Sequence, residues 1–293
     1  IMRKSKYLVL SSFYFDFNDD LTEIIEIKSL FENQNILDLF RFDKMIIIKN
    51  KHFQRGNINF IYLPQNIEII NEDVFANNKI EILDLSNCIK LKNIENWSFW
   101  NNQIKQLKLP KNIREISRDT FAYNQIESLD LSNCIKLRII KPLAFMNNQI
   151  KQLKLPKNIE EIRTSAFEDN QIESLDLSSC INLNIINEYA FESNQIKQLK
   201  LPKNIEILDK YTFSINQIEI LDLSNCIKLK EILSDAFSDN PLKEIKILDN
   251  VRIHYYYINY ENLWNKFIDY YNNNKKKAGD YKYIDNKWQW YPL

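Results

Sequence analysis

Four cysteines form the most regular chemical feature of the chain, because thiols can form disulfides, bind metals or act as nucleophiles. They stand 46 residues apart, at Cys88, Cys134, Cys180 and Cys226. If each period forms two rungs of a stacked coil, successive cysteines lie roughly 10 Å apart. A disulfide needs Cα atoms within about 7 Å, and a shared zinc ion is excluded for the same reason. We therefore expect buried free thiols that pack as small apolar groups, and no bound metal.

The carboxylates and histidines are poorly placed for acid–base catalysis. Aspartates also recur every 46 residues, but a lysine in the same column separates each from the next. Two acids sharing one pocket, as hydrolysis of a glycosidic bond requires, are therefore not predicted. His52 and His254 lie far apart in the chain, and no serine stands in a G-x-S-x-G context. We expect no catalytic residue and no cofactor. The aspartates are Asp84, Asp130, Asp176 and Asp222.

The composition excludes several classes of binding partner for this chain. The 293 residues include 39 basic and 39 acidic side chains, so the formal net charge is zero. That balance argues against nucleic acid, or an anionic membrane, held by bulk charge. Hydrophobic residues make up 45 % of the chain, but no run approaches the roughly 18 apolar residues of a membrane span. With only two glycines, phosphate-binding loops built on several glycines are excluded.

Internal repeats in the sequence set the positions of these recurring cysteines and aspartates. Each 46-residue period contains a 22-residue unit, such as residues 104–125, and a 24-residue unit, such as residues 126–149. Both carry L-x-x-L-x-L-x-x-N/C, with Ile often replacing the first Leu, which is the leucine-rich repeat signature. A more divergent unit, from about residue 36 to 57, keeps Phe53 in register. The pattern predicts a solenoid in which every rung adds one short strand to a parallel sheet.

Each L-x-L segment predicts which side chains face the core. Leu107 and Leu109 should point inward, and Gln106 and Lys108 outward, because successive strand residues alternate between faces. An Asn at the ninth position should be buried and bond the backbone of the turn that follows. At the fifth position, aspartate and lysine alternate, so we expect each acid from the fourth rung on to lie between two bases. Such a face has little net field to steer a highly charged partner.

Two further columns recur once per unit. The phenylalanines should fill the far wall of the coil, and asparagines three residues later should bond along the coil axis and satisfy turn backbone. The phenylalanines are Phe75, Phe99, Phe121, Phe145, Phe167, Phe191, Phe213 and Phe237; the asparagines are Asn78, Asn102, Asn124, Asn148, Asn170, Asn194, Asn216 and Asn240.

Two stretches of sequence carry a family resemblance. They are LPKNIREI at residues 109–116 with the following Phe121, and the tail FIDYYNNNKKKAGDYKYIDNKW at residues 267–288. In both, the chain resembles the BspA-like group of leucine-rich repeat proteins. It departs from that group by Asn where many members have Cys after the AF motif, and by lacking the Ile-Gly step before it. The resemblance implies surface-exposed or secreted proteins that bind other proteins, including host matrix, without catalysis.

The repeat and the resemblance together predict the architecture. The fold class is an α/β repeat solenoid, a right-handed coil with a parallel β-sheet on one face, short helical or 3-10 turns on the other and an aromatic C-terminal cap. A helix is expected at residues 261–271 and a hairpin at residues 281–290. Residues 1–15 weakly resemble a signal segment without a cleavage site; the alternative is an N-terminal strand that covers the first repeat. The expected segments are an N-terminal flank or cap at 1–35, the solenoid at 36–251 and the cap at 252–293.

The candidate binding residues include an outward aromatic patch. Phe60, Tyr62 and Ile82 occupy positions where most later rungs carry Gln, Lys, Asp or Ser, and clustered aromatics can be binding hot spots. The alternative is that residues 1–35 pack over them. The other candidates are Gln106 and Lys108 on the outward face, and Trp288 and Trp290, which could stack on a glycan or peptide.

These observations predict a non-enzymatic scaffold for protein or glycan binding and adhesion. We expect a monomer at the cell surface or in secreted form, with no nucleic-acid partner and no membrane insertion. One alternative is a cytoplasmic interaction scaffold, and another is an effector with enzymatic activity in its flanks.

Overall fold

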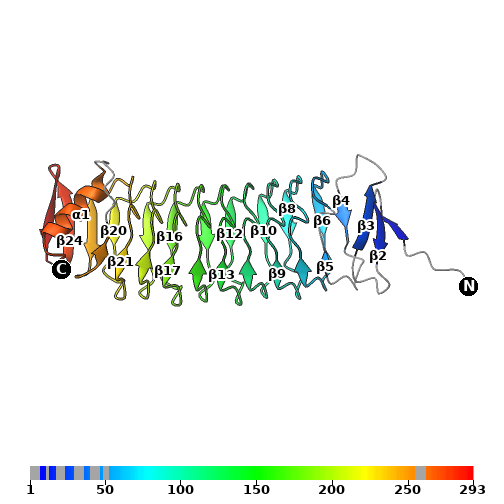
Figure 1. Ribbon diagram of the computed structural model, residues 1–293, viewed down its shortest axis with the longest axis horizontal. Helices are drawn as coiled ribbons and strands as arrows, with labels where there is room; N and C mark the ends of the chain where they lie inside the picture. The colour runs from blue at the N-terminus through cyan, green and yellow to red at the C-terminus, as the bar shows by residue number, and fades with distance from the viewer. Residues whose placement is uncertain are drawn as a thin grey trace, which may run out of the picture.

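The chain winds into an elongated stack of rungs along one axis (Figure 1). The computed structural model describes residues 7–10, 13–17, 24–29, 36–39, 47–48, 53–254 and 262–292. Each rung contributes one short strand to each of two sides, and a run of turns forms the third side. Strands of successive rungs pair in parallel, which confirms the predicted solenoid.

One side, the first sheet face, is built from the L-x-L segments. In β10, Leu107 is only 8 % exposed, whereas Gln106 and Lys108 on either side of it are exposed. Leu109 packs partly buried against the core, so the predicted alternation is confirmed. The strands are β4 (Ile36–Asp38), β6 (Phe60–Tyr62), β8 (Ile82–Asp84), β10 (Gln106–Lys108), β12 (Ser128–Asp130), β14 (Gln152–Lys154), β16 (Ser174–Asp176), β18 (Gln198–Lys200), β20 (Ile220–Asp222) and β22 (Glu244–Ile247).

A second sheet face, made of two-residue strands, follows the turn after each L-x-L segment. These strands form one continuous ten-stranded sheet, and the second residue of each is a buried Ile or Leu. They are β5 (Ile47–Ile48), β7 (Ile69–Ile70), β9 (Asn93–Ile94), β11 (Glu115–Ile116), β13 (Ile139–Ile140), β15 (Glu161–Ile162), β17 (Ile185–Ile186), β19 (Ile207–Leu208), β21 (Glu231–Ile232) and β23 (Arg252–Ile253).

The third side, the Phe side, contains the phenylalanine column. From Phe53 to Phe237, rings of successive rungs stack with centroids 5.2–5.6 Å apart and are buried. Those separations are typical of favourable offset stacking. The stack confirms the predicted column and shows that the divergent unit before residue 58 keeps its register.

Helical or 3-10 turns are absent from residues 53–254, so that part of the fold prediction was wrong. Residues two positions before and after each phenylalanine have positive φ instead, as at Asp119 (54°) and Tyr123 (57°). The N–H of Phe121 therefore donates along the axis to the carbonyl of Ala144, at 2.9 Å. An α-helix would need successive N–H groups to bond within their own segment. Here alternate N–H groups, such as those of Asp119, Phe121 and Tyr123, bond to the next rung instead.

Asparagines satisfy the backbone behind each phenylalanine. Asn148, 7 % exposed, accepts from the N–H of Ile126 at 3.1 Å and donates to the carbonyls of Phe121 and Phe145 at 2.9 and 3.1 Å. Its counterparts repeat this pattern, so the predicted bonding along the axis is confirmed.

The ninth-position asparagines differ from the prediction. Asn112 is half-buried, and its amide donates to the carbonyl of Ile89 at 2.7 Å. That carbonyl belongs to the turn of the preceding unit, not to the turn that follows. The 24-residue unit has two more residues in this turn than the 22-residue unit, and the longer turn places its carbonyl against the neighbouring amide.

The first sheet face is interrupted, contrary to the expected single sheet. It divides into β4–β6, β8–β10, β12–β14–β16–β18 and β20–β22, and β14 pairs with β16 through only Gln152 and Ser174. Every gap follows a 22-residue unit, whereas strands joined across a 24-residue unit share three residue pairs. Because the units flanking a strand differ in length, one neighbouring strand comes into hydrogen-bonding register and the other does not.

A helix and a hairpin, together called the C-terminal helix–hairpin (residues 262–292), follow the last rung. The helix α1 (Leu263–Asn273) begins at Asn262, whose side chain accepts from the N–H of Asn265. The Trp264 ring packs edge-on against Phe237, the last ring of the phenylalanine stack, with centroids 5.2 Å apart. Strand β24 (Gly279–Ile284) pairs antiparallel with β22, and β25 (Lys287–Tyr291) pairs with β24. The predicted helix and hairpin are confirmed, with the helix shifted by two residues.

Antiparallel strands precede the solenoid: β1 (Tyr7–Leu10), β2 (Phe13–Phe17) and β3 (Ile24–Ser29). Much of the predicted flank at 1–35, with part of the candidate signal segment, lies outside the described residues, as does His52. In the described part of the chain the single helix has eleven residues and is too short to cross a membrane.

Candidate functional site

Charged side chains on the first sheet face pair between rungs. Lys108 reaches Asp84 at 3.3 Å, and the same pairs join Asp130 to Lys154 at 3.8 Å and Asp176 to Lys200 at 3.6 Å. Each of these aspartates pairs with the lysine of the following rung. The expectation that every acid lies between two bases was therefore wrong. The lysine of the preceding rung lies across a junction of the first sheet face that is unpaired or joined through one residue pair only.

Hydrogen bonds keep the aspartates of these ion pairs ionised. The Ser132 hydroxyl and N–H donate to Asp130 at 2.6 and 2.9 Å and, with Lys154, hold the pKa of that carboxyl below its usual range. Serine contacts likewise lower the pKa of Asp84 and Asp176, against the opposing effect of burial. A carboxyl tied to its own turn in this way cannot supply a proton near neutral pH.

Asp222 is the exception among the aspartates of the first sheet face. Its carboxylate accepts from the N–H of Ser224 at 3.0 Å and from the Ser224 hydroxyl. The lysine expected to pair with it, Lys246, turns to Glu244 at 3.2 Å, and Glu244 also lies 3.9 Å from Lys282 of the hairpin. Among the described residues, Asp222 therefore has no ion pair within 4 Å.

The cysteines are buried free thiols, as predicted. Burial raises the pKa of Cys88 to about 11 and of Cys226 to about 12, so neither is a thiolate at neutral pH. No group of three or more His, Cys, Asp or Glu side chains that could hold a metal comes together in residues 53–254 or the rest of the described chain. His254 lies 3.7 Å from Glu231, at the end of the stack.

Three apolar side chains of the predicted patch project from β6 and β8. Phe60 is 42 % exposed, Tyr62 is 54 % exposed and Ile82 is 48 % exposed. Gln106 and Lys108 are also exposed, but Lys108 is engaged with Asp84. The patch lies across an open junction of the first sheet face, where no ladder of residues 53–254 joins β6 to β8.

The two candidate tryptophans of the hairpin do not form an open surface. Trp288 is 5 % exposed and packs edge-on against Phe267 with centroids 5.3 Å apart. Trp290 is half-buried; its indole N–H donates to the carbonyl of Ala278 at 3.1 Å, and Lys277 lies over its ring at 4.9 Å. Trp288 is therefore a core residue, because the alternation of β25 turns it toward α1.

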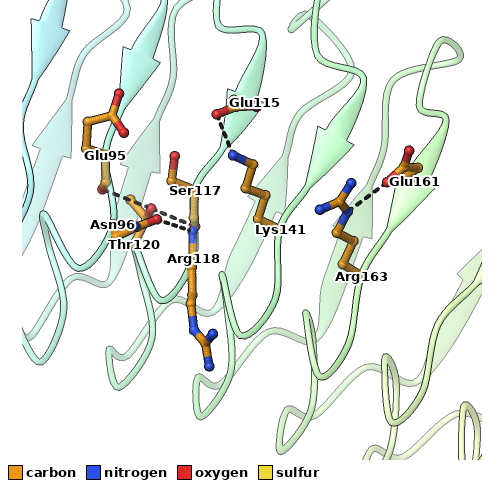
Figure 2. Close-up of polar contacts among 9 residues, drawn as sticks. All are labelled: Glu95, Asn96, Glu115, Ser117, Arg118, Thr120, Lys141, Glu161 and Arg163. Carbon is orange, nitrogen blue, oxygen red and sulfur yellow. Dashed lines mark hydrogen bonds and ion pairs between the residues drawn. The ribbon is translucent and has the colours of Figure 1, made fainter.

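The second sheet face carries a row of mixed charges, shown in Figure 2. Lys141 of one rung reaches Glu115 of the previous rung at 2.9 Å, and Arg163 contacts Glu161 of its own rung at 2.7 Å. Because opposite charges meet along this row, it offers no field of one sign to a partner.

Grooves open where the first sheet face is weakly paired. The larger lies between β18 and β20 and has a volume of about 1130 Å³. A smaller one, of about 460 Å³, lies at the β14–β16 junction. Sequence reasoning missed both, although two residues mark the larger groove: Ile220, where the two preceding 24-residue units carry Ser, and Pro241, where the preceding units from residue 80 on end in Gln.

Residues 23–140 and 138–263 match the BspA type leucine-rich repeat region, in six copies. The chain belongs to the BspA-type leucine-rich repeat family. This BspA-type chain has the fold of a leucine-rich repeat protein from Bacteroides ovatus, with a TM-score of 0.61 and 18 % identity over 85 % of this chain and 67 % of that one. The pneumococcal vaccine antigen PcpA is a weaker match, with a TM-score of 0.45 and 12 % identity over 87 % and 94 % of the two chains. No curated protein matches this BspA-type sequence.

Proposed function

We propose that this chain is a non-enzymatic scaffold that binds a protein partner through its first sheet face, at a cell surface or in secreted form. The observation that carries the proposal is the patch of Phe60, Tyr62 and Ile82. Exposed aromatic and aliphatic side chains on neighbouring strands are typical of interface centres. Membership of the BspA-type family supports adhesion and a surface location.

The other sides of the solenoid support this assignment. The Phe side and the second sheet face bond every rung to the next, so they maintain the stack. The C-terminal helix–hairpin serves as its cap, since Trp264 covers the ring of Phe237. The first sheet face contributes fewer bonds between rungs, so its outward residues can vary without loss of the stack.

The test is an array of extracellular matrix proteins and glycans probed with the full chain. We expect a protein to bind, and Tyr62→Ala to weaken that binding by about tenfold or more, as loss of a central aromatic contact does. The matched control is Tyr123→Ala, since Tyr123 is similarly exposed, at 45 %, but lies on the Phe side. Unchanged binding by Tyr62→Ala would contradict the proposal, and selective binding of a glycan would replace its partner class.

A further inference from the structure

The groove between β18 and β20 is lined by both apolar and charged side chains. Leu199, Leu201 and Ile220 supply apolar surface, and Lys197 and Lys203 lie on the β18 side. The β20 side carries Glu219 and Asp222. None of its lining residues is aromatic, which distinguishes the groove from the Phe60–Tyr62 patch and from a surface that stacks on sugar rings.

The groove leaves backbone edges open on both sides. Strand β18 pairs with β16, and β20 pairs with β22, but within residues 53–254 no ladder joins β18 to β20. Residues of the two strands still lie within 8 Å of each other at Cα, so the junction is too narrow for a further strand between them. A ligand therefore lies on the surface of the groove and is recognised by the side chains that line it.

Opposite charges face each other across the groove without meeting. Among the described residues, neither Lys197 nor Lys203 has an ion pair within 4 Å, and Asp222 has none because Lys246 is held by Glu244. Lys200 leans away to Asp176. Glu219 is paired with Lys243 at 2.9 Å. In the part of the chain that the structure describes, the charged groups of the lining without an ion pair are therefore Lys197 and Lys203 on the β18 side and Asp222 on the β20 side.

The sequence departs from the repeat at this groove. Ile220 is 55 % exposed and stands where the two preceding 24-residue units carry Ser128 and Ser174. Leu199 is only partly buried, whereas its counterparts Leu107 and Leu153 are 8 % and 9 % exposed. The exposed isoleucine adds apolar surface at this junction.

We propose that this groove binds an extended peptide segment of a protein partner, in which an apolar side chain is flanked by an acidic residue and a basic residue. The apolar side chain lies on Leu199 and Ile220, the acid faces Lys197 and Lys203, and the base faces Asp222. The inference rests on the proposed binding function and adds a second site with its own specificity.

The test uses a positional-scanning library of acetylated, amidated hexapeptides on the full chain. We expect selection of an apolar residue with both an acid and a base nearby. Ile220→Ser should weaken binding of the selected peptide by about tenfold or more, and serine is tolerated there because Ser128 and Ser174 occupy the same position. Asp222→Asn should remove the preference for the base and keep that for the acid.

The matched control is Ile215→Ser, since Ile215 is similarly exposed, at 50 %, but lies on the Phe side. It should leave peptide binding unchanged. Ile82→Ser, in the same ILDLSNC context as Ile220, tests the N-terminal patch separately. No selected sequence, or selection of acids or bases alone, overturns the groove site. Loss in Ile82→Ser without loss in Ile220→Ser also overturns it, but places peptide binding at the patch and leaves the proposed function standing. Glycan binding that is lost in Ile220→Ser would overturn the peptide as occupant.

Discussion

The Phe side and the first sheet face differ in how they join successive rungs by hydrogen bonds. On the Phe side, every phenylalanine N–H from Phe75 to Phe213 donates to the next rung, across 22-residue and 24-residue units alike. On the first sheet face, three residue pairs join strands across a 24-residue unit, and one pair or none across a 22-residue unit. The difference shows that the stack does not depend on continuous strand pairing along the first sheet face.

The consequence is a division of labour within each rung. Buried asparagines and stacked rings on the Phe side leave little freedom to change. Open junctions on the first sheet face let apolar residues such as Ile82 and Ile220 stay exposed without disturbing the stack.

The largest effect is expected when an asparagine of the Phe side is removed and compared with the removal of a ninth-position asparagine. Asn148→Ala leaves the buried N–H of Ile126 and the carbonyls of Phe121 and Phe145 without their amide partner. At about 1 kcal/mol or more for each buried group, we expect a loss of about 3 kcal/mol in the free energy of unfolding. Asn158→Ala removes one exposed bond to Ile135 and should cost about 0.5 kcal/mol. Urea unfolding followed by circular dichroism measures both, and equal losses would remove the distinction between the sides.

A smaller effect is expected from reversing one charge on the first sheet face. Asp130→Lys breaks the pair with Lys154 and places two lysines on paired strands. We expect a loss of about 1 kcal/mol at low salt and less at high salt, because exposed charges are screened.

The control for this charge reversal is the exchange Asp130→Lys with Lys154→Asp, which restores an opposite pair and should recover part of the loss. Melting temperatures at two salt concentrations decide the outcome. Equal shifts at both concentrations would show that the ladder does not contribute electrostatically.

The smallest effect concerns a carboxyl on the Phe side. Burial and the nearby Glu168 and Asp169 raise the pKa of Glu192 above its ordinary 4.5, although the Ser214 hydroxyl donates to it at 2.8 Å. A raised folded-state pKa means that its stabilising contribution is present below the ordinary pKa and is lost as pH rises through the folded pKa. Glu192→Gln should therefore stabilise the half-buried site by roughly 0.5 kcal/mol at pH 7 and by nothing well below pH 4.5. A pH series of unfolding free energies checks this, and a gain that persists at low pH would point to packing instead.

Much of the fold was predictable because the repeat places like residues in like environments. The phenylalanine stack, the buried asparagines and the free cysteines follow from one register, and the register follows from spacing alone. The Phe-side turns were mistaken for helices, because residues such as Leu143 and Ile215 rarely adopt positive φ and gave no sign of it.

Of the candidate binding residues, those on the solenoid were placed more reliably than those on the hairpin. Tyr62 faces solvent because strand alternation decides it. Trp288 is buried because β25 packs on α1, and no repeat specifies which face of a single hairpin meets the helix.

From the sequence alone come the rung, its core and its direction of stacking, since these depend on which side chains recur at which interval. The tertiary structure alone decides how far apart neighbouring strands stand, which lysine reaches which acid, and where a groove opens. Those outcomes depend on the fit between unequal neighbouring units and on the hairpin, whose strand β24 pairs with β22 and brings Lys282 to Glu244. Neither is encoded in a single repeat.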